Sequence, residues 1–238
     1  MNKLIEGAGK LGIELSTRQV KQFELYYQEL IEWAERFNLT AITDYSEVQV
    51  KHFLDSLTIT LALTKEELEK PGFNIIDIGT GAGFPGVPLK ILFPLPRLVL
   101  IESTAKKTTF LHHIIRKLEL DNVEVVRGRA EDIACSPLYR EQFALVVSRA
   151  VASLPTLVEL ALPFCRVGGR FVAQKKGEIS QEINKASKAI VTLGGRLDRV
   201  EKIELQGLDE RYLVIIDKIY PTPDRYPRRP GIPKRRPI

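Results

Sequence analysis

The stretch Asn74–Gly86 reads NIIDIGTGAGFPG, and it decides how the rest of the chain is interpreted. A short apolar run leads to the carboxylate Asp77, and four glycines then occur within eight residues. An apolar run of this length is typical of a buried parallel strand. Glycines directly after such a strand let a ligand approach the backbone before a helix begins. The stretch therefore predicts a strand, a tight turn and a helix that together form a cofactor loop.

Two cofactors fit this loop. Gly81-x-Gly83-x-x-Gly86 matches the dinucleotide fingerprint, and Asp77-x-Gly79-x-Gly81-x-Gly83 matches the loop that binds S-adenosylmethionine. Both cofactors need an acid at the end of the next strand to accept hydrogen bonds from ribose hydroxyls, and Glu102 lies there. A carboxylate at Asp77 attracts the cationic methionine end of S-adenosylmethionine but repels a pyrophosphate. We therefore favour S-adenosylmethionine and keep a nicotinamide-dependent oxidoreductase as the alternative.

The hydrophobic pattern after residue 72 alternates between strands and helices. We expect strands at 73–78, 98–101, 123–126, 143–148 and 170–173, and helices at 85–93, 104–119, 153–163 and 179–193. Two further strands, near 197–205 and 211–219, follow with no helix between them. Alternating units favour an open, mostly parallel sheet, and the closing hairpin adds an antiparallel strand that plain dinucleotide-binding domains lack. The predicted fold is α/β, the Rossmann-like fold of S-adenosylmethionine-dependent methyltransferases.

Residues 1–70 contain helical patterns and no strand pattern. Residues 16–37 are expected to form an amphipathic helix that Ser16 and Gln19 cap reciprocally, and a second helix is expected to open at Ser46. We divide the chain into an N-terminal helical cap (1–70), a cofactor-binding domain (71–220) and a C-terminal tail (221–238).

The composition narrows the class of protein. No apolar stretch approaches the roughly 18–20 residues that cross a bilayer, and the glycine-interrupted N-terminus does not resemble a signal peptide. The two cysteines, Cys135 and Cys165, lack the spacing of metal ligands. We expect a cytoplasmic monomer with no metal site and no membrane partner.

The C-terminal tail carries the net charge. Residues 224–238 contain six basic residues and one acidic residue, which accounts for the whole net charge of +5. Prolines in the tail favour an extended conformation, and cations on an extended run can reach phosphates. We therefore predict that the tail binds RNA; the alternative is a disordered, solubilising tail. The predicted RNA-binding residues are Arg225, Arg228, Arg229, Lys234, Arg235 and Arg236, with Lys175, Lys176 and His52 closer to the sheet.

The segment Asp77–Gly86 resembles the first motif of the glucose-inhibited division protein B family, the small-subunit ribosomal RNA methyltransferases G of bacteria. Further matches to that family follow in the same order along the chain. They are Asn38-Leu39-Thr40, His52-Phe53-Leu54-Asp55-Ser56-Leu57, Glu102-Ser103, Lys106-Lys107, Arg129-Ala130-Glu131, Ser148-Arg149-Ala150-Val151-Ala152, Lys175-Lys176-Gly177 and Tyr226-Pro227-Arg228-Arg229-Pro230-Gly231. The resemblance implies methylation of N7 of one guanine in 16S ribosomal RNA, with S-adenosylmethionine as donor and the small ribosomal subunit as partner.

The resemblance also implies roles for individual positions. It places Gly79, Thr80, Gly81, Ala82, Gly83 and Phe84 along the methionine and ribose, with Asp77 behind them. Glu102, Ser103 and Thr104 are expected to meet the ribose and adenine, and Ala130 and Glu131 to flank the adenine. Arg149 is expected to contact the cofactor or the target base, and is the one candidate for a catalytic role.

The sequence contains no obvious general base, and the predicted reaction does not require one. Guanine N7 is a lone-pair nucleophile with no proton to lose, so proximity and orientation can supply the catalysis. Neither cysteine follows a proline, which argues against a covalent cytosine route. A non-catalytic RNA-binding assembly factor with the same fold stays open as an alternative.

Overall fold

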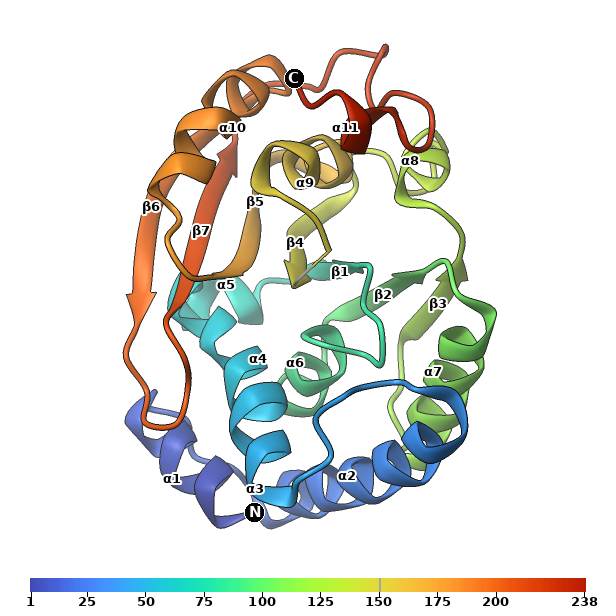
Figure 1. Ribbon diagram of the computed structural model, residues 1–238, viewed down its shortest axis with the longest axis vertical. Coiled ribbons are helices and arrows are strands. Elements are labelled where there is room, and N and C mark those ends of the chain that lie inside the picture. The colour runs from blue at the N-terminus through green and yellow to red at the C-terminus, as the bar shows by residue number, and fades with distance from the viewer. Residues whose placement is uncertain (150) are drawn as a thin grey trace.

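The computed structural model describes residues 1–149 and 151–238, except for the side chains of Lys65 and Glu69. Its centre is a seven-stranded sheet with the order β3-β2-β1-β4-β5-β7-β6 (Figure 1). The strands are β1 (Asn74–Ile78), β2 (Arg97–Glu102), β3 (Val123–Arg127), β4 (Phe143–Arg149), β5 (Cys165–Lys176), β6 (Gly195–Ile203) and β7 (Arg211–Lys218). Strands β1 to β5 are parallel, whereas β7 is antiparallel to both β5 and β6. The predicted parallel sheet with a closing hairpin is confirmed.

Alternate residues of the central strands enter two separate hydrophobic cores. In β1, Ile75 joins one core and Ile76 joins the other; in β2, Leu98 and Leu100 alternate in the same way with Val99 and Ile101. Both faces of the sheet are covered by helices, which is why these strands are almost continuously apolar. The edge strand β6 is instead rich in charged residues, as expected for an edge that must not pair with another chain.

Helices from both the N-terminal region and the cofactor domain cover the first face. They are α1 (Asn2–Lys10), α2 (Thr17–Phe37), α3 (Tyr45–Val48), η1 (Gln49–Leu54), α4 (Asp55–Leu57), η2 (Thr58–Ala62), α5 (Lys65–Glu69), α6 (Gly86–Leu92) and α7 (Ala105–Lys117). Apolar residues of α1, α2 and η1 share one core with this face of the sheet. The N-terminal helices are therefore built into the main core.

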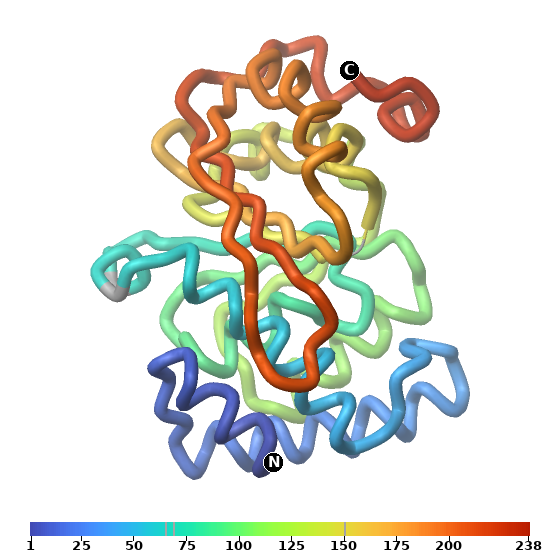
Figure 2. Tube along the Cα trace, turned by 60° about the vertical axis from the view of Figure 1, so that its left-hand side comes forward, coloured from blue at the N-terminus to red at the C-terminus, as the bar shows by residue number. Residues whose placement is uncertain are grey.

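The second face carries α8 (Ala130–Ile133), α9 (Leu154–Ala161) and α10 (Ser180–Thr192). The turn between β6 and β7 extends away from these helices toward the N-terminal ones, as Figure 2 shows. A Cβ atom at Gly207 in that turn would lie 3.4 Å from Val50 of η1. The hairpin thus connects the far edge of the sheet to the N-terminal helices.

The N-terminal region differs in detail from the prediction. The capping box of Ser16 and Gln19 on α2 is present. The next helix opens at Tyr45 and not at Ser46, because the side chain of Asp44 accepts the backbone N–H of Glu47. A short side chain that accepts an N–H at this position is the preferred helix cap. Helix α1 and the short α8 are not among the predicted elements.

The C-terminal tail is folded against the body, contrary to the expectation of an extended or disordered segment. Tyr226 and Ile238 pack on the second core, and the tail contains a short helix, α11 (Ile232–Arg235), with Pro233 in its first turn. Proline is compatible with the first turn of a helix because its missing N–H has no intrahelical partner there. The tail lies over α8 and α9, at the opposite end of the molecule from the N-terminus (Figure 1).

In the part of the chain that the structure describes, no helix has the length and apolar character needed to cross a bilayer. Within the same residues, no cluster of three or more His, Cys, Asp or Glu side chains is placed to hold a metal ion.

Candidate functional site

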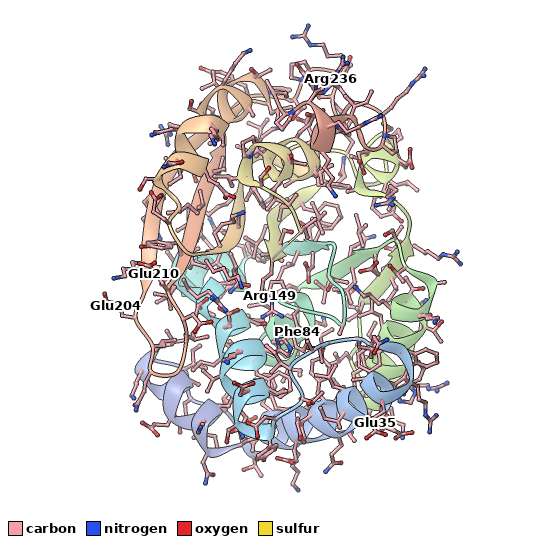
Figure 3. The ribbon with its side chains drawn as sticks, viewed as in Figure 1. Glu35, Phe84, Arg149, Glu204, Glu210 and Arg236 are labelled. Atoms are coloured by element: carbon pink, nitrogen blue, oxygen red, sulfur yellow. The ribbon has the colours of Figure 1, made fainter. Side chains whose placement is uncertain are left out.

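The carboxyl ends of β1, β2 and β4 meet at one edge of the sheet. Asp77 lies near the end of β1, Glu102 ends β2 and Arg149 ends β4. Because β1 lies between the other two strands, the glycine loop that follows it is flanked by Glu102 on one side and Arg149 on the other. Figure 3 shows Phe84 and Arg149 close together at the centre of the molecule. Ligands of open α/β sheets bind at this edge.

The side chain of Asp77 stabilises the conformation of the glycine loop. Its side chain is fully buried; Oδ2 accepts hydrogen bonds from Thr80 Oγ1 at 2.6 Å and from the backbone N–H of Gly86 at 2.8 Å. Its other oxygen, Oδ1, is buried without a hydrogen-bond partner. Burial raises the pKa of Asp77 to about 7, against the lowering effect of the Thr80 and Gly86 hydrogen bonds. A buried acceptor that still lacks a donor is suited to a nearby cationic ligand group.

Glu102 joins the glycine loop to the next strand. Its Oε2 accepts the N–H of Gly81 at 3.1 Å, and its Oε1 accepts the N–H of Thr104 at 2.8 Å. An ionised carboxylate has about four acceptor positions, so two remain for ribose hydroxyls. Backbone bonds of this kind fix the orientation of the carboxylate before a ligand arrives. Ser103 and Thr104 follow it as exposed residues.

The glycines of the loop serve different purposes. A Cβ atom added at Gly79 would collide with Val151, and one at Gly83 would collide with Tyr26 and Val87. At Gly81, where φ is +63°, an added Cβ would meet no protein atom within 4 Å. Gly79 and Gly83 are therefore required by protein packing, whereas the space in front of Gly81 is open for a ligand.

The predicted adenine-flanking residues lie after β3. Ala130 is buried at the start of α8, and Glu131 follows it. The carboxylate of Glu131 accepts the backbone N–H of Gly231, from the C-terminal tail, at 3.1 Å. The tail therefore contacts the segment expected to bind adenine.

Arg149 connects the end of β4 to the N-terminal helices. Its Nη1 donates to the carboxylate of Asp55 at 3.1 Å and to the carbonyl of Lys51 at 3.1 Å, and its guanidinium lies 4.9 Å from the ring centre of Phe84. His52 lies against both of these groups, with its ring 4.6 Å from that of Phe84 and its Nδ1 3.3 Å from Arg149 Nη2. Burial, reinforced by the Arg149 charge, lowers the pKa of His52 to about 3, so the imidazole is neutral at physiological pH.

The backbone of η1 gives these contacts their geometry. Residues Gln49–Leu54 form a π-helical segment, a rare irregularity that is frequent at functional sites. Its last turn places the Lys51 carbonyl and the His52 ring toward Arg149. An ordinary helical period does not predict this distortion.

A cavity of about 540 Å³ opens beside Arg149, and one of its lining residues, Val151, lies against Gly79 of the glycine loop. It has four further cations, two acids and one amide in its wall. They are Lys51, Lys175, Lys176 and Arg211, Asp55 and Glu182, and Gln174. The excess of cations makes the cavity suitable for an anionic polymer.

The predicted RNA-binding residues separate into two groups. His52, Lys175 and Lys176 line the cavity. Arg225, Arg229, Lys234, Arg235 and Arg236 are exposed on the tail, and Figure 3 shows Arg236 far from Arg149. Arg228 does not belong with them: it forms a double hydrogen-bonded ion pair with Glu159, whose side chain is completely buried. Its guanidinium is partly exposed but is engaged by Glu159.

The cavity wall also contains residues that are not among the predicted site residues, namely Lys51, Gln174, Glu182 and Arg211, whereas Asp55 is predicted only as part of a matched motif. Gln174 pairs in register with Arg149 across β4 and β5, and Arg211 pairs with Lys176 across β5 and β7. Only correct strand pairing could have brought them together. Ala150, which falls in another matched motif, lies outside the described residues.

Solved structures of other proteins are similar to this chain in fold, at low sequence identity. Geranyl diphosphate C-methyltransferase from Streptomyces coelicolor A3(2) is 14% identical, with a TM-score of 0.53 over 82% of this chain and 98% of that one. TYW2 from M. jannaschii, solved with AdoMet, is 17% identical, with a TM-score of 0.50 over 65% of this chain and 74% of the other. The predicted fold of S-adenosylmethionine-dependent methyltransferases is confirmed.

Sequence relatives extend over the whole chain. Proteins named ribosomal RNA small subunit methyltransferase G are 53% identical in Dehalococcoides mccartyi (strain CBDB1) and 48% identical in Roseiflexus castenholzii (strain DSM 13941 / HLO8), each covering 100% of both chains. The GidB family, described as rRNA small subunit methyltransferase G, matches residues 19–213. This extent removes the nicotinamide alternative, and the chain belongs to the GidB family of rRNA small subunit methyltransferases G.

Proposed function

We propose that the protein transfers the methyl group of S-adenosylmethionine to N7 of one guanine in 16S ribosomal RNA, in the cytoplasm. The observation that carries this proposal is the pair of buried acids around an open glycine turn, in a chain that matches the family over residues 19–213. Asp77 has one carboxylate oxygen without a hydrogen-bond partner. The carboxylate of Glu102 accepts two backbone N–H groups and has two further acceptor positions for a ligand. These residues fit a cofactor with a cationic end and a ribose.

The cofactor is assigned to a defined set of positions. Gly79–Phe84 line the methionine and ribose, and Asp77 supports them; Glu102, Ser103 and Thr104 meet the ribose and adenine. Ala130 and Glu131 flank the adenine, and Arg149 orients the cofactor or the target. In this proposal residues 1–70 cap the site, residues 71–220 bind the cofactor and residues 221–238 form a folded tail.

S-adenosylmethionine supplies an electrophilic methyl group on a sulfonium. The protein contributes position and charge. The open space at Gly81 admits the ligand to the backbone, and Arg149, fixed by Asp55 and the Lys51 carbonyl, lies in the wall of the adjoining cavity. His52 is neutral and takes up no proton in the physiological range. No side chain is required to act as a base, because N7 carries a free lone pair.

The decisive experiment is nucleoside mapping by mass spectrometry. Small subunits isolated from cells that lack this protein are incubated with the protein and labelled S-adenosylmethionine. We expect one 7-methylguanosine per 16S RNA. A protein that binds the subunits but transfers no methyl group would instead be an RNA-binding assembly factor.

Cofactor binding is expected to release a proton through Asp77. The raised pKa means that the free protein holds this proton until the pH passes about 7. A cationic ligand beside Asp77 favours the ionised form and lowers that pKa. Affinity therefore rises as the pH rises through about 7, and binding at pH 6.5 releases a proton. Calorimetry in buffers of different ionisation heat measures this release, which Asp77→Asn should abolish and the remote Asp198→Asn should leave unchanged.

The exposed end of the tail is expected to contribute to RNA affinity through phosphate contacts. Replacing Lys234, Arg235 and Arg236 together by alanine should reduce the salt dependence of RNA binding, with a slope lower by up to about two or three units. Filter binding over a salt series measures it. The matched control is the triple alanine variant of Lys3, Arg18 and Lys21, exposed residues on helices α1 and α2 at the other end of the molecule. Equal slopes for the two variants would contradict an RNA-binding role for the tail.

A further inference from the structure

Among the described residues, most of the buried side-chain polar atoms that lack a hydrogen bond belong to residues lining the cavity beside Arg149. Within residues 1–149 and 151–238, five buried side-chain polar atoms make no hydrogen bond, and four of them belong to residues lining this cavity. They are Asp55 Oδ1, Gln174 Oε1, Glu182 Oε2 and Arg211 Nη1. Buried polar atoms are nearly always paired, so such a concentration indicates groups that await a ligand.

The four atoms differ in whether an oppositely charged group lies close to them. Glu182 Oε2 lies 2.7 Å from Lys175 Nζ, so it has a charge partner. Asp55 Oδ1 lies 3.5 Å from Arg211 Nε, and Arg211 Nη1 lies 4.0 Å from Asp209, so these are loose ion pairs. Gln174 Oε1 has no partner of either kind, although the Nε2 atom of the same amide donates to the Asp55 carbonyl at 2.5 Å and to Thr58 Oγ1 at 3.1 Å. The amide orientation is therefore fixed, and its oxygen is left as an acceptor.

Guanine offers the complementary set of groups. Its Watson–Crick edge carries the N1–H and 2-amino donors beside the O6 acceptor, and enzymes that act on an extruded base read this edge. Two acceptors, from Asp55 and Gln174, match the two donor groups. The Arg211 guanidinium matches O6. Adenine, with an acceptor at N1 and no 2-amino group, does not fit this arrangement.

The order of the strands gives the base its orientation. The glycine loop follows β1, Arg149 ends β4, Gln174 lies on β5 and Arg211 begins β7, in that order across the sheet. N7 and the N1/2-amino edge lie on opposite sides of a purine. A guanine in the cavity with N7 toward the glycine loop therefore directs its N1/2-amino edge toward β5 and β7. Asp55, which Gln174 contacts, lies on the same side.

Arg211 covers the acceptor of Asp55 in the free protein. A guanidinium and the N1–C2–2-amino edge of guanine present similar pairs of N–H donors. The distance of 3.5 Å between Arg211 Nε and Asp55 Oδ1 is too long for a good hydrogen bond. Replacing Arg211 at Asp55 by a better-placed N–H donor of the base therefore costs little free energy. Arg211, whose side chain is 14% exposed, can turn from Asp55 toward O6 when the base enters.

We propose that Asp55 and Gln174 select guanine by accepting hydrogen bonds from its N1–H and 2-amino group, while Arg211 moves to O6. The inference rests on the proposed function, because it assigns the target base of that reaction to this cavity. Asp55 Oδ1 accepts from N1–H, and Gln174 Oε1 accepts from the 2-amino group.

The test removes the 2-amino group from the substrate and the acceptor from the protein. Once mapping has located the methylated guanosine, small subunits are reconstituted with RNA that carries inosine at that position. For the wild-type protein, kcat/KM for methyl transfer should fall about 10- to 100-fold, the effect of one hydrogen bond that leaves a buried acceptor unpaired. Inosine keeps N7, N1–H and O6, so the nucleophile itself is unchanged.

The inosine penalty is the ratio of kcat/KM for guanosine to kcat/KM for inosine. In Gln174→Met, which preserves the size of the side chain, this penalty should shrink to less than about 3-fold, because the variant already lacks the acceptor that the 2-amino group would bind. Gln174→Glu keeps an acceptor and should retain the penalty. The control Gln28→Met makes the same change at an exposed position of α2 and should behave as wild type. Each penalty is a ratio within one protein, so a general loss of activity cancels.

Each result is decisive. An unchanged penalty in Gln174→Met overturns the proposal, and so does a wild-type protein that methylates inosine as well as guanosine. If Gln174→Met does not fold, Gln174→Leu removes the same acceptor, and the same change in the inosine penalty is expected. A wild-type protein that transfers no methyl group to guanosine refutes the proposed function instead, which separates the two failures.

Discussion

Gly81→Val is expected to lower the affinity for S-adenosylmethionine at least about 100-fold, roughly 2.7 kcal/mol. Gly81 is the position of the loop where an added side chain would meet no protein atom within 4 Å, so a valine there occupies ligand space. The change also forces a branched residue into a left-handed conformation at φ +63°, which costs about 1–2 kcal/mol of stability. Calorimetric titration with S-adenosylmethionine measures the first effect, and thermal unfolding measures the second.

The chain contains a matched control for this variant. Gly12 has φ +73° and, like Gly81, open space around an added Cβ, but it follows helix α1 away from the cofactor edge. Gly12→Val should lose a similar amount of stability and bind S-adenosylmethionine as the wild type does. Retained affinity in Gly81→Val would refute the assignment of the glycine loop to the cofactor.

Arg228→Ala is expected to destabilise the protein by about 3–5 kcal/mol, the cost of leaving a buried charge without its partner. Glu159 is completely buried on α9, and the variant removes the side-chain donors Nε and Nη2, which reach its two oxygens at 2.8 and 2.5 Å, while the backbone N–H of residue 228 stays. Without Arg228 the carboxylate stays in a low-dielectric environment, and the tail loses its principal attachment to α9. Denaturant unfolding measures the change in the free energy of unfolding.

Neighbouring residues of the tail provide the comparison. Arg225→Ala and Arg229→Ala remove exposed arginines and should change stability by no more than about 0.5 kcal/mol. Replacing both Arg228 and Glu159 by methionine should recover much of the lost stability, because an apolar pair needs no charge compensation. A small effect of Arg228→Ala would mean that the ion pair does not hold the tail.

This attachment changes the expected effect of removing the tail. A free RNA-binding tail could be deleted after Pro223 without any effect on cofactor affinity. In the folded protein the N–H of Gly231 bonds Glu131, and the side chain of Arg140 bonds the carbonyls of Thr222 and Tyr226. Deletion therefore exposes part of the second core and removes a contact to the expected adenine segment.

Much of the fold could be predicted from local sequence. The apolar runs that became β1, β2 and β4 are buried on both faces, so their composition signals their state directly. The capping box of Ser16 and Gln19 is also a local pattern, and it marks the start of α2 correctly. Helix α1 and the tail were missed because tertiary packing, more than local propensity, stabilises them.

The sequence by itself determined the glycine loop and the sheet around it. The spacing of Asp77, the glycines and Glu102 is fixed by a strand, a turn and the next strand, all of which are short-range features. Tertiary structure alone decided the cavity wall. Asp55 begins α4, directly after the π-helical segment, whereas Gln174 and Arg211 come from two strands far from it in the chain, and only the tertiary structure brings the three together. Tertiary structure also decided that Arg228 pairs with Glu159, because a run of basic residues in a sequence does not reveal which of them forms an ion pair with a buried acid.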